Sequence, residues 1–301
     1  MKRRRRRRLW VRILLSAVCL LLVTVLGMGV SFMVGYEIFE DVSYGDLECE
    51  VMDVFIPDEA YGRETNGCVL VIHGGSWMEG DKADERLMCR YIADRGYIAA
   101  TVNYRLYDRT SEDYHVETVL DELDAALATL KAFAAEKGIH LTSAATYGYS
   151  AGGHLSLLYA YKRGSEAPLP VRFCADLAGP ADLCEEIWGA ERATGISLIL
   201  SGKPMVEGTI ENEERDRLLR EFSPISYISS DSPPTILAYG GKDTVVPKEN
   251  GDSLVARLAK KSVRYDSVFL PNSTHSMVTD LGDRMRFSGL VVDYCEEFFG
   301  K

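Results

Sequence analysis

Gly148-Tyr149-Ser150-Ala151-Gly152 is the most informative motif of this 301-residue chain. A Gly-x-Ser-x-Gly between a buried strand and a helix places a serine hydroxyl on a sharp turn, where glycines avoid collisions as the chain reverses. Ala144–Tyr147 predicts the strand, and Gly152–Ala160 predicts the start of the helix, with an apolar face. This context predicts that Ser150 is a nucleophile; the alternative is an ordinary glycine-rich turn.

Strand-like and helix-like runs alternate along the rest of the chain. After a short link at Val42–Gly45, the pattern predicts an edge strand at Glu48–Ile56 and further strands at Cys68–Ile72, Tyr97–Val102, Val171–Leu177, Pro234–Gly240 and Val263–Leu270. It predicts helices at Ala83–Asp94, Val116–Ala135, Gly251–Lys260 and Asp283–Phe299. Such alternation predicts an α/β fold with a mostly parallel central sheet and helices on both faces. Residues 179–222 are polar and offer no strand, which predicts a small helical cap insertion.

A serine nucleophile needs a histidine base and an acid that orients the imidazole. His275 follows the last predicted strand, where the chain order Ser, Asp, His expects the base. Asp243 follows the preceding strand on a glycine loop and is the predicted acid, with Asp182 in the insertion as the other candidate. His154, one turn after Ser150, is predicted to be structural.

His73-Gly74-Gly75-Ser76-Trp77 follows a predicted buried strand. Glycines in such a loop let backbone N–H groups point at a developing oxyanion, and the residue after the nucleophile supplies another donor. The predicted oxyanion-hole donors are Gly75, Ser76 and Ala151, and His73 is predicted to brace the loop.

The charge is divided unevenly along the chain. Residues 1–12 contain eight basic residues and no acidic ones, whereas the remainder contains 26 basic and 45 acidic residues, a net charge of −19. Nucleic-acid binding requires a basic footprint, which this acidic body does not offer. No nucleic-acid partner is therefore expected.

Ile13–Val34 is an uncharged stretch of 22 residues, long enough to cross the hydrocarbon core of a bilayer. Basic residues beside a membrane span stay in the cytoplasm. We therefore expect a basic cytoplasmic segment at 1–12, a single transmembrane anchor or uncleaved signal at 13–35, and an extracytoplasmic catalytic domain at 36–301. The alternative is a secreted protein whose signal is cleaved after Gly27-x-Gly29.

The cysteines predict neither a metal site nor a disulfide framework. Cys19 lies in the apolar stretch, and the other six are widely spaced. The sequence has no Cys-x-x-Cys and no histidine-rich cluster, so no metal is expected. Disulfide pairing stays open.

Together these motifs resemble the α/β-hydrolase fold, and within it the esterase branch with a His-Gly-Gly-x-Trp loop. That branch includes hormone-sensitive-lipase-like esterases, feruloyl and acetylxylan esterase-like proteins, and kynurenine formamidase. The resemblance covers residues 48–300 and rests on His73–Trp77, Asn103–Leu106, Gly148–His154, Ser232–Thr235, Gly240–Pro247 and His275. It implies that Ser150, Asp243 and His275 form a triad and that the activity is ester hydrolysis without a cofactor.

The predicted function is that of a serine carboxylesterase, which hydrolyses small or carbohydrate-linked acyl esters through an acyl-enzyme. Trp77 in the loop and Trp188 in the insertion are candidates for walls of the substrate pocket, with packing as the alternative for Trp188. Two other functions stay open: an arylformamidase or amidase on the same triad, and an inactive hydrolase fold that serves as a binding module.

Overall fold

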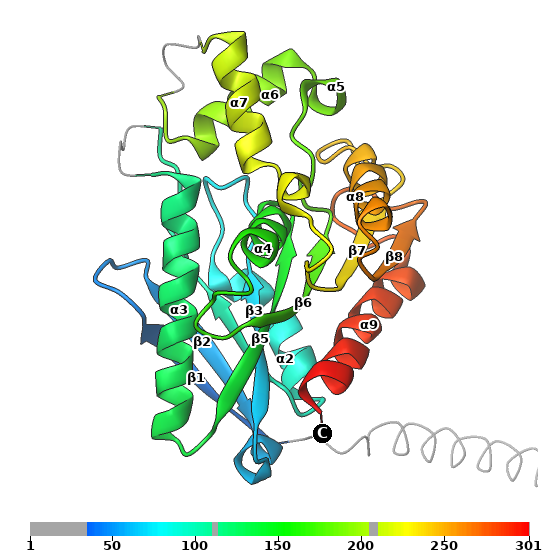
Figure 1. Ribbon diagram of the computed structural model, residues 1–301. Helices are drawn as coiled ribbons and strands as arrows, with labels where there is room; N and C mark the ends of the chain where they lie inside the picture. The colour runs from blue at the N-terminus through cyan, green and yellow to red at the C-terminus, as the bar shows by residue number, and fades with distance from the viewer. Residues whose placement is uncertain (1–34, 110–113, 205–209, 301) are drawn as a thin grey trace, which may run out of the picture. The chain divides into compact units, whose positions relative to one another are not determined.

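The computed structural model describes residues 35–109, 114–204 and 210–300. Contacts divide the chain into residues 1–35 and 36–301, and the described part of the second unit is built on one eight-stranded sheet (Figure 1). The strand order is β1-β2-β4-β3-β5-β6-β7-β8. The strands are β1 Tyr36–Ser43, β2 Val51–Pro57, β3 Asn66–Ile72, β4 Ile98–Val102, β5 Leu141–Tyr149, β6 Val171–Leu177, β7 Thr235–Gly240 and β8 Tyr265–Leu270.

From β4 to β8 all neighbouring strands in the sheet are parallel, so their carboxyl ends lie along one edge. Ligands of open α/β sheets bind at this edge. The loops that leave it after β3, β5, β7 and β8 carry the His73–Trp77 loop, Ser150, Asp243 and His275. The parallel sheet therefore brings together segments that are far apart in the sequence.

The antiparallel edge of the sheet differs from the prediction. β2 pairs with both β1 and β4, so it is an interior strand, and β1 is the edge strand. The predicted link at Val42–Gly45 starts inside β1 and was wrong. β2 looks half exposed in the sequence because of Asp53, but this side chain is fully buried and forms ion pairs with Lys82 and Arg86. Burial of a paired charge of this kind cannot be recognised from hydrophobic periodicity.

Helices cover both faces of the sheet (Figure 1). Residues of α3, α4 and α8 belong to the larger apolar cluster, and residues of α2 and α9 belong to the cluster on the other face. Several helices start or end a few residues from their predicted bounds. The observed bounds are α2 Arg86–Ala93, α3 Val116–Glu136, α4 Ala151–Lys162, α8 Glu249–Lys260 and α9 Leu281–Phe299.

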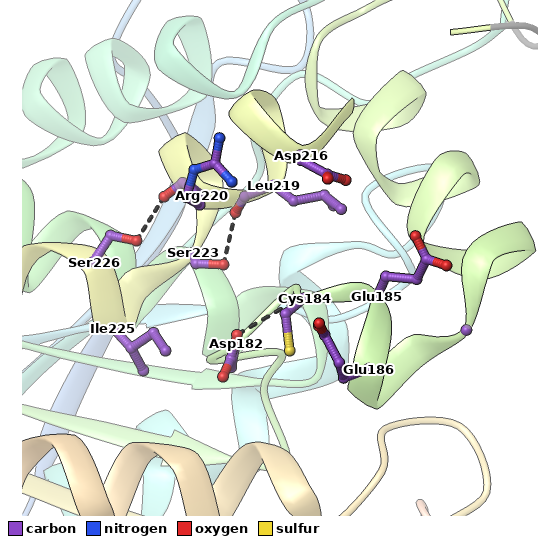
Figure 2. A pocket seen from close by; sticks show the side chains of 11 residues that line it. Asp182, Cys184, Glu185, Glu186, Asp216, Leu219, Arg220, Ser223, Ile225 and Ser226 are labelled. Carbon is purple, nitrogen blue, oxygen red and sulfur yellow. Dashed lines mark hydrogen bonds between the residues drawn. The ribbon is translucent and has the colours of Figure 1, made fainter. Parts of the chain in front are cut away.

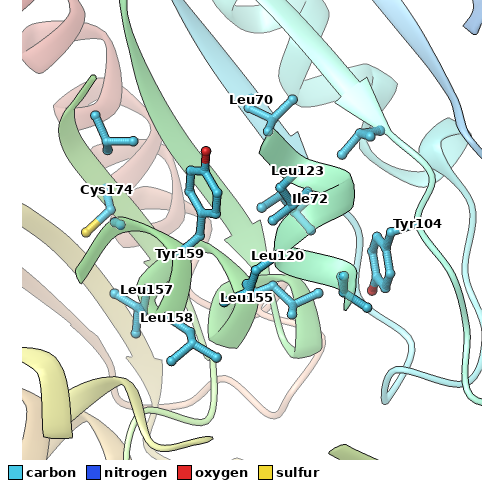
Figure 3. Packing of buried hydrophobic residues seen from close by; sticks show 14 of the residues in the cluster. Leu70, Ile72, Tyr104, Leu120, Leu123, Leu155, Leu157, Leu158, Tyr159 and Cys174 are labelled. Atoms are coloured by element: carbon cyan, nitrogen blue, oxygen red, sulfur yellow. The ribbon is translucent and has the colours of Figure 1, made fainter. Parts of the chain in front are cut away.

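Leucines of α3 and α4 belong to the same larger cluster as Leu70 and Ile72 of β3 (Figure 3). Leu120, Leu123, Leu155 and Leu158 have no exposed surface. Burying each such side chain contributes about 1.5–3 kcal/mol to folding. This packing holds α4, the helix that begins directly after Ser150, in a fixed position against the sheet.

The insertion after β6 is helical, as the sequence predicts. It forms α5 Glu185–Trp188, α6 Ala190–Leu200 and α7 Asn212–Phe222. The guanidinium of Arg192 in α6 donates to the carbonyl of Val245, two residues after Asp243. The insertion therefore contacts the loop that carries the predicted acid.

The predicted cytoplasmic segment and membrane span lie outside the described residues, except for Gly35. In the part of the chain that is described, no helix combines the length and the apolar character needed to cross a bilayer. The six described cysteines are all free thiols.

Candidate active site

Ser150 occupies a strained turn between β5 and α4. Its φ of 56° and ψ of −121° are unusual for a residue with a side chain, and such strain is typical of functional turns. Flanking glycines are required because a Cβ on Gly148 would lie 2.0 Å from the carbonyl oxygen of Gly152. A Cβ on Gly152 would lie 2.0 Å from the carbonyl oxygen of Ile72 at the end of β3. The motif thus locks the serine turn against the neighbouring strand.

Ser150, His275 and Asp243 lie in hydrogen-bonding contact, although they come from three different loops. The Nε2 atom of His275 is 2.9 Å from Oγ of Ser150, and its Nδ1 atom is 2.7 Å from Oδ2 of Asp243. The side chain of Asp243 is only 1% exposed. Its other oxygen, Oδ1, accepts from the backbone N–H groups of Val245 and Val246.

The other candidate acid, Asp182, lies elsewhere. Its carboxylate accepts from the N–H of Cys184, and it lines a cavity of about 490 Å³ beside α7 (Figure 2). Glu185, Glu186, Asp216 and Arg220 line the same cavity. Asp182 therefore belongs to the junction between the insertion and the sheet domain rather than to the contacts of His275.

The His73–Trp77 loop lies directly beside the serine turn. A Cβ on Gly74 would lie 2.9 Å from the carbonyl oxygen of Tyr149 and 3.3 Å from Cβ of Ser150. The φ angles of Gly75, Ser76 and Trp77 are all positive, at 115°, 53° and 62°. Consecutive residues with this backbone conformation form a tight turn next to the hydroxyl, and Ala151 begins α4 on its other side.

His73 and His154 support this loop from two sides. His73 is buried and stacks on Tyr104 with ring centroids 4.3 Å apart, and its Nδ1 atom lies 2.7 Å from the carbonyl oxygen of Gly74. His154 accepts from the indole N–H of Trp77 and contacts the carbonyl oxygen of Phe222 at 2.9 Å. Burial lowers the pKa of His154 to about 4, so the neutral ring connects the loop, α4 and the end of α7.

Both candidate tryptophans, Trp77 and Trp188, are largely buried. Trp77 is 5% exposed and Trp188 is 7% exposed, and both belong to the larger apolar cluster. The indole N–H of Trp188 donates to the carbonyl of Asp182. Both residues therefore pack within the protein, and their place in the wall of a substrate pocket stays a prediction.

Two polar residues beside the site were missed in the sequence. Tyr149 donates a hydrogen bond to the carbonyl oxygen of His275, and Asp176 is fully buried at the end of β6 beside α4. An aspartate in the otherwise apolar second half of Val171–Leu177 was a signal, because a buried carboxyl group needs partners. Tyr149 carried no such signal, since it looks like any aromatic residue at the end of a buried strand.

The hydroxyl of Tyr239 contacts both Asp176 and Gly179, and these two hydrogen bonds need two protons. The hydroxyl of Tyr239 lies 2.6 Å from Oδ2 of Asp176 and 2.6 Å from the carbonyl oxygen of Gly179. A phenol has one proton and can donate only one of these bonds. Both contacts are satisfied when Asp176 is protonated and donates to Tyr239, which in turn donates to Gly179. Burial raises the pKa of Asp176 to about 7, in agreement with this arrangement.

We therefore expect the free energy of unfolding to contain a pH-dependent contribution from Asp176. The unfolded chain releases this proton near pH 3.8 and the folded chain near pH 7. The stabilisation is complete below the lower value and is lost as the pH rises towards 7, by at most about 1.4 kcal/mol per pH unit. In Asp176→Asn the amide can donate to Tyr239 at any pH. The free energy of unfolding of this variant, measured in urea at pH 5 and pH 8, should therefore lack this decrease.

Asp266→Asn is the matched control, because Tyr294 donates to Asp266 in a comparable pair on β8 that is only partly buried. This variant should keep the pH dependence of the wild-type protein. Equal pH dependence in the wild-type protein and Asp176→Asn would show that Asp176 is ionised in the folded state.

Among the described residues, no cluster of three or more His, Cys, Asp or Glu side chains is arranged to hold a metal ion. The site consists of a serine, a histidine, an aspartate and a backbone turn. Such a set can carry out proton transfer and nucleophilic attack with its own side chains.

The strand order and the strained serine turn define an α/β-hydrolase fold. A family model described as BD-FAE matches residues 52–258, and the chain belongs to this family. The mostly parallel sheet and the serine turn expected from the sequence are confirmed.

Curated relatives of the chain include esterases. The probable carboxylic ester hydrolase LipM of Mycobacterium tuberculosis is 27% identical over 74% of this chain and 52% of its own length. Esterase LipC of the same organism is 26% identical over 81% of this chain and 60% of its own length. The chain thus spans between about half and three fifths of the length of these relatives.

Solved structures show the same fold. A truncated carbohydrate esterase from gut microbiota has a TM-score of 0.73 and 18% identity, over 89% of this chain and 98% of the other. Esterase B from Lactobacillus rhamnosis has a TM-score of 0.66 and 20% identity, over 87% and 88% of the two chains. At these sequence identities, the structural similarity shows a shared fold and does not show a shared activity.

Proposed function

We propose that this protein is a serine carboxylesterase. The observation that carries the proposal is the continuous set of contacts from Ser150 through His275 to Asp243, at 2.9 and 2.7 Å. A histidine between a serine hydroxyl and a buried carboxylate is the arrangement that activates a serine for acyl transfer. The relatives named as esterases support ester hydrolysis over the other reactions of this fold.

In the proposed mechanism each residue has a role. His275 accepts the proton of Ser150 as the hydroxyl attacks the ester carbonyl, and Asp243 holds the imidazole with Nε2 free for this proton. The N–H groups of Gly75, Ser76 and Ala151 stabilise the oxyanion, and loss of one such donor typically lowers turnover by about 10²–10³-fold. His275 then gives this proton to the leaving alcohol. In the second step His275 accepts a proton from water as the water attacks the acyl-enzyme, and returns it to Ser150 as the carboxylic acid leaves.

The proposed substrates are small or carbohydrate-linked acyl esters. The support is indirect: one structural neighbour is named as a carbohydrate esterase, and its fold extends over nearly the whole sheet domain of this chain. A panel of p-nitrophenyl esters of increasing acyl length, with acetylated xylan beside them, measures this preference directly.

The central test combines labelling with turnover. A fluorophosphonate probe should label Ser150, identified by mass spectrometry of the labelled peptide, and the same protein should hydrolyse p-nitrophenyl acetate. No labelling and no turnover of any ester would indicate an inactive binding module. Turnover of N-formylkynurenine with none of the esters would indicate a formamidase instead.

We also propose that residues 13–35 anchor the protein in the cell membrane, with residues 1–12 in the cytoplasm and the catalytic domain, 36–301, outside. The support is the uncharged stretch Ile13–Val34 directly after a basic block.

We further propose that residues 179–222 form the cap of the catalytic domain.

Deleting residues 1–34 should release an active enzyme. The full-length protein is expected to sediment with membranes in ultracentrifugation, and the shortened protein is expected to stay in the supernatant with its kcat for p-nitrophenyl acetate retained. A full-length protein that remains in the supernatant, or a shortened protein that aggregates, would count against the anchor.

A further inference from the structure

Tyr149 connects the strand that leads to the nucleophile with the loop that carries the base. It is the last residue of β5, directly before Ser150. Its hydroxyl donates to the backbone carbonyl of His275 at 2.8 Å, and its ring centroid lies 5.2 Å from the centroid of the imidazole, with 30° between the planes. One side chain therefore contacts both the backbone and the ring of His275.

The residues that follow His275 border a cavity. A cavity of about 660 Å³ between α2 and α9 is lined by Tyr149 and by Ser276, Met277 and Val278, the three residues that follow His275. At the start of the loop, Asp280 accepts from Asn272 and Ser273, which fixes that end. Beyond His275, Met277 is buried, whereas Ser276 and Val278 are exposed. A directional bond has more influence beside such a cavity than it has in a close-packed core.

We infer that Tyr149 is a positioning residue, which fixes the carbonyl of His275 and thereby the imidazole between Ser150 and Asp243. The inference rests on the proposed function, because it assigns His275 the role of the base. A displacement of about 1 Å at a reacting group can lower a rate by about 10²-fold. The bond from Tyr149 restrains displacements of this size.

The bond persists over the pH range in which a histidine base works. Burial, together with the charges of Asp243 and Glu85, raises the pKa of Tyr149 to about 12, and Arg284 opposes this only partly. The phenol therefore keeps its proton and remains a donor. Any loss of activity in a Tyr149 variant is thus expected at every pH tested.

The test is Tyr149→Phe in the full-length protein. Removal of one hydroxyl keeps the ring contact but deletes the bond to His275, and we expect kcat for p-nitrophenyl acetate to fall about tenfold while KM stays close to the wild-type value. The low-field proton resonance of the hydrogen bond between His275 and Asp243 should broaden or shift. A residue that served stability alone would lower the unfolding temperature and leave both readouts unchanged.

Tyr147→Phe is the matched control. Tyr147 lies two residues earlier on β5, lines the same cavity, and contacts Arg284 through its hydroxyl instead of His275. This variant should keep the wild-type kcat and proton resonance. Equal kcat and an unchanged resonance in Tyr149→Phe would overturn the inference even if the enzyme is an esterase, whereas failure of the proposed function appears as undiminished turnover in Ser150→Ala.

Discussion

Replacing Ser150 by alanine should lower kcat for ester hydrolysis by about 10⁶-fold. The hydroxyl oxygen at this position lies 2.9 Å from Nε2 of His275, the atom that accepts its proton in the proposed mechanism. Without it no acyl-enzyme forms, and the remaining rate comes from binding and from the oxyanion donors, which by themselves give about 10³–10⁴-fold over the reaction in water. The measurement is kcat with p-nitrophenyl acetate, together with loss of fluorophosphonate labelling.

The fold of this variant should be intact. Alanine keeps the backbone of the turn, where the φ of Ser150 is 56°, so the strain is equal in both proteins. Circular dichroism and the unfolding temperature should therefore match the wild-type values. Ser276→Ala is the control, because it removes an exposed hydroxyl next to His275 that takes no part in the triad. Retained turnover in Ser150→Ala would falsify the proposed mechanism.

Asp243→Asn should lower kcat by about 10⁴-fold. Oδ1 of Asp243 accepts from the N–H groups of Val245 and Val246, so the amide oxygen of an asparagine must occupy that position. Its NH₂ group then faces Nδ1 of His275, which has to become an acceptor. The imidazole is forced into the tautomer with the proton on Nε2, and it can no longer accept the proton of Ser150.

Asp182→Asn tests which of the two candidate aspartates, Asp182 or Asp243, is the acid of the triad. Because its carboxylate lines the cavity beside α7 and contacts the N–H of Cys184, this variant should keep a kcat close to that of the wild-type enzyme. The comparison is made with p-nitrophenyl acetate at saturating concentration. A large loss in Asp182→Asn with little loss in Asp243→Asn would reverse the assignment of the acid.

The sequence located Ser150, Asp243 and His275 because each follows a strand that is readable as an apolar run. In a parallel sheet the carboxyl ends of the strands share one edge, so chain order and strand ends are enough to bring these residues to the same region. The same reasoning gave the alternation of strands and helices and the helical insertion after β6. These features depend on local patterns that each segment carries by itself.

Features that depend on pairing between distant segments were not predictable. Asp53 made an interior strand resemble an edge because its partners, Lys82 and Arg86, are about thirty residues away in the sequence. The sequence also did not show that the indole N–H of Trp77 would donate to His154. Hydrophobic periodicity does not predict which polar atom a buried side chain will contact.

By itself the sequence determined the class of fold, the turn that presents Ser150 and the order of the chemical groups around it, because strand and turn signals act over a few neighbouring residues. Only the assembled tertiary structure sets the 2.7 and 2.9 Å contacts of His275, the hydrogen bond from Tyr149 to its carbonyl and the contact between Tyr239 and buried Asp176. These depend on distances between atoms on different strands and on removal from water, and both arise only when the sheet has assembled.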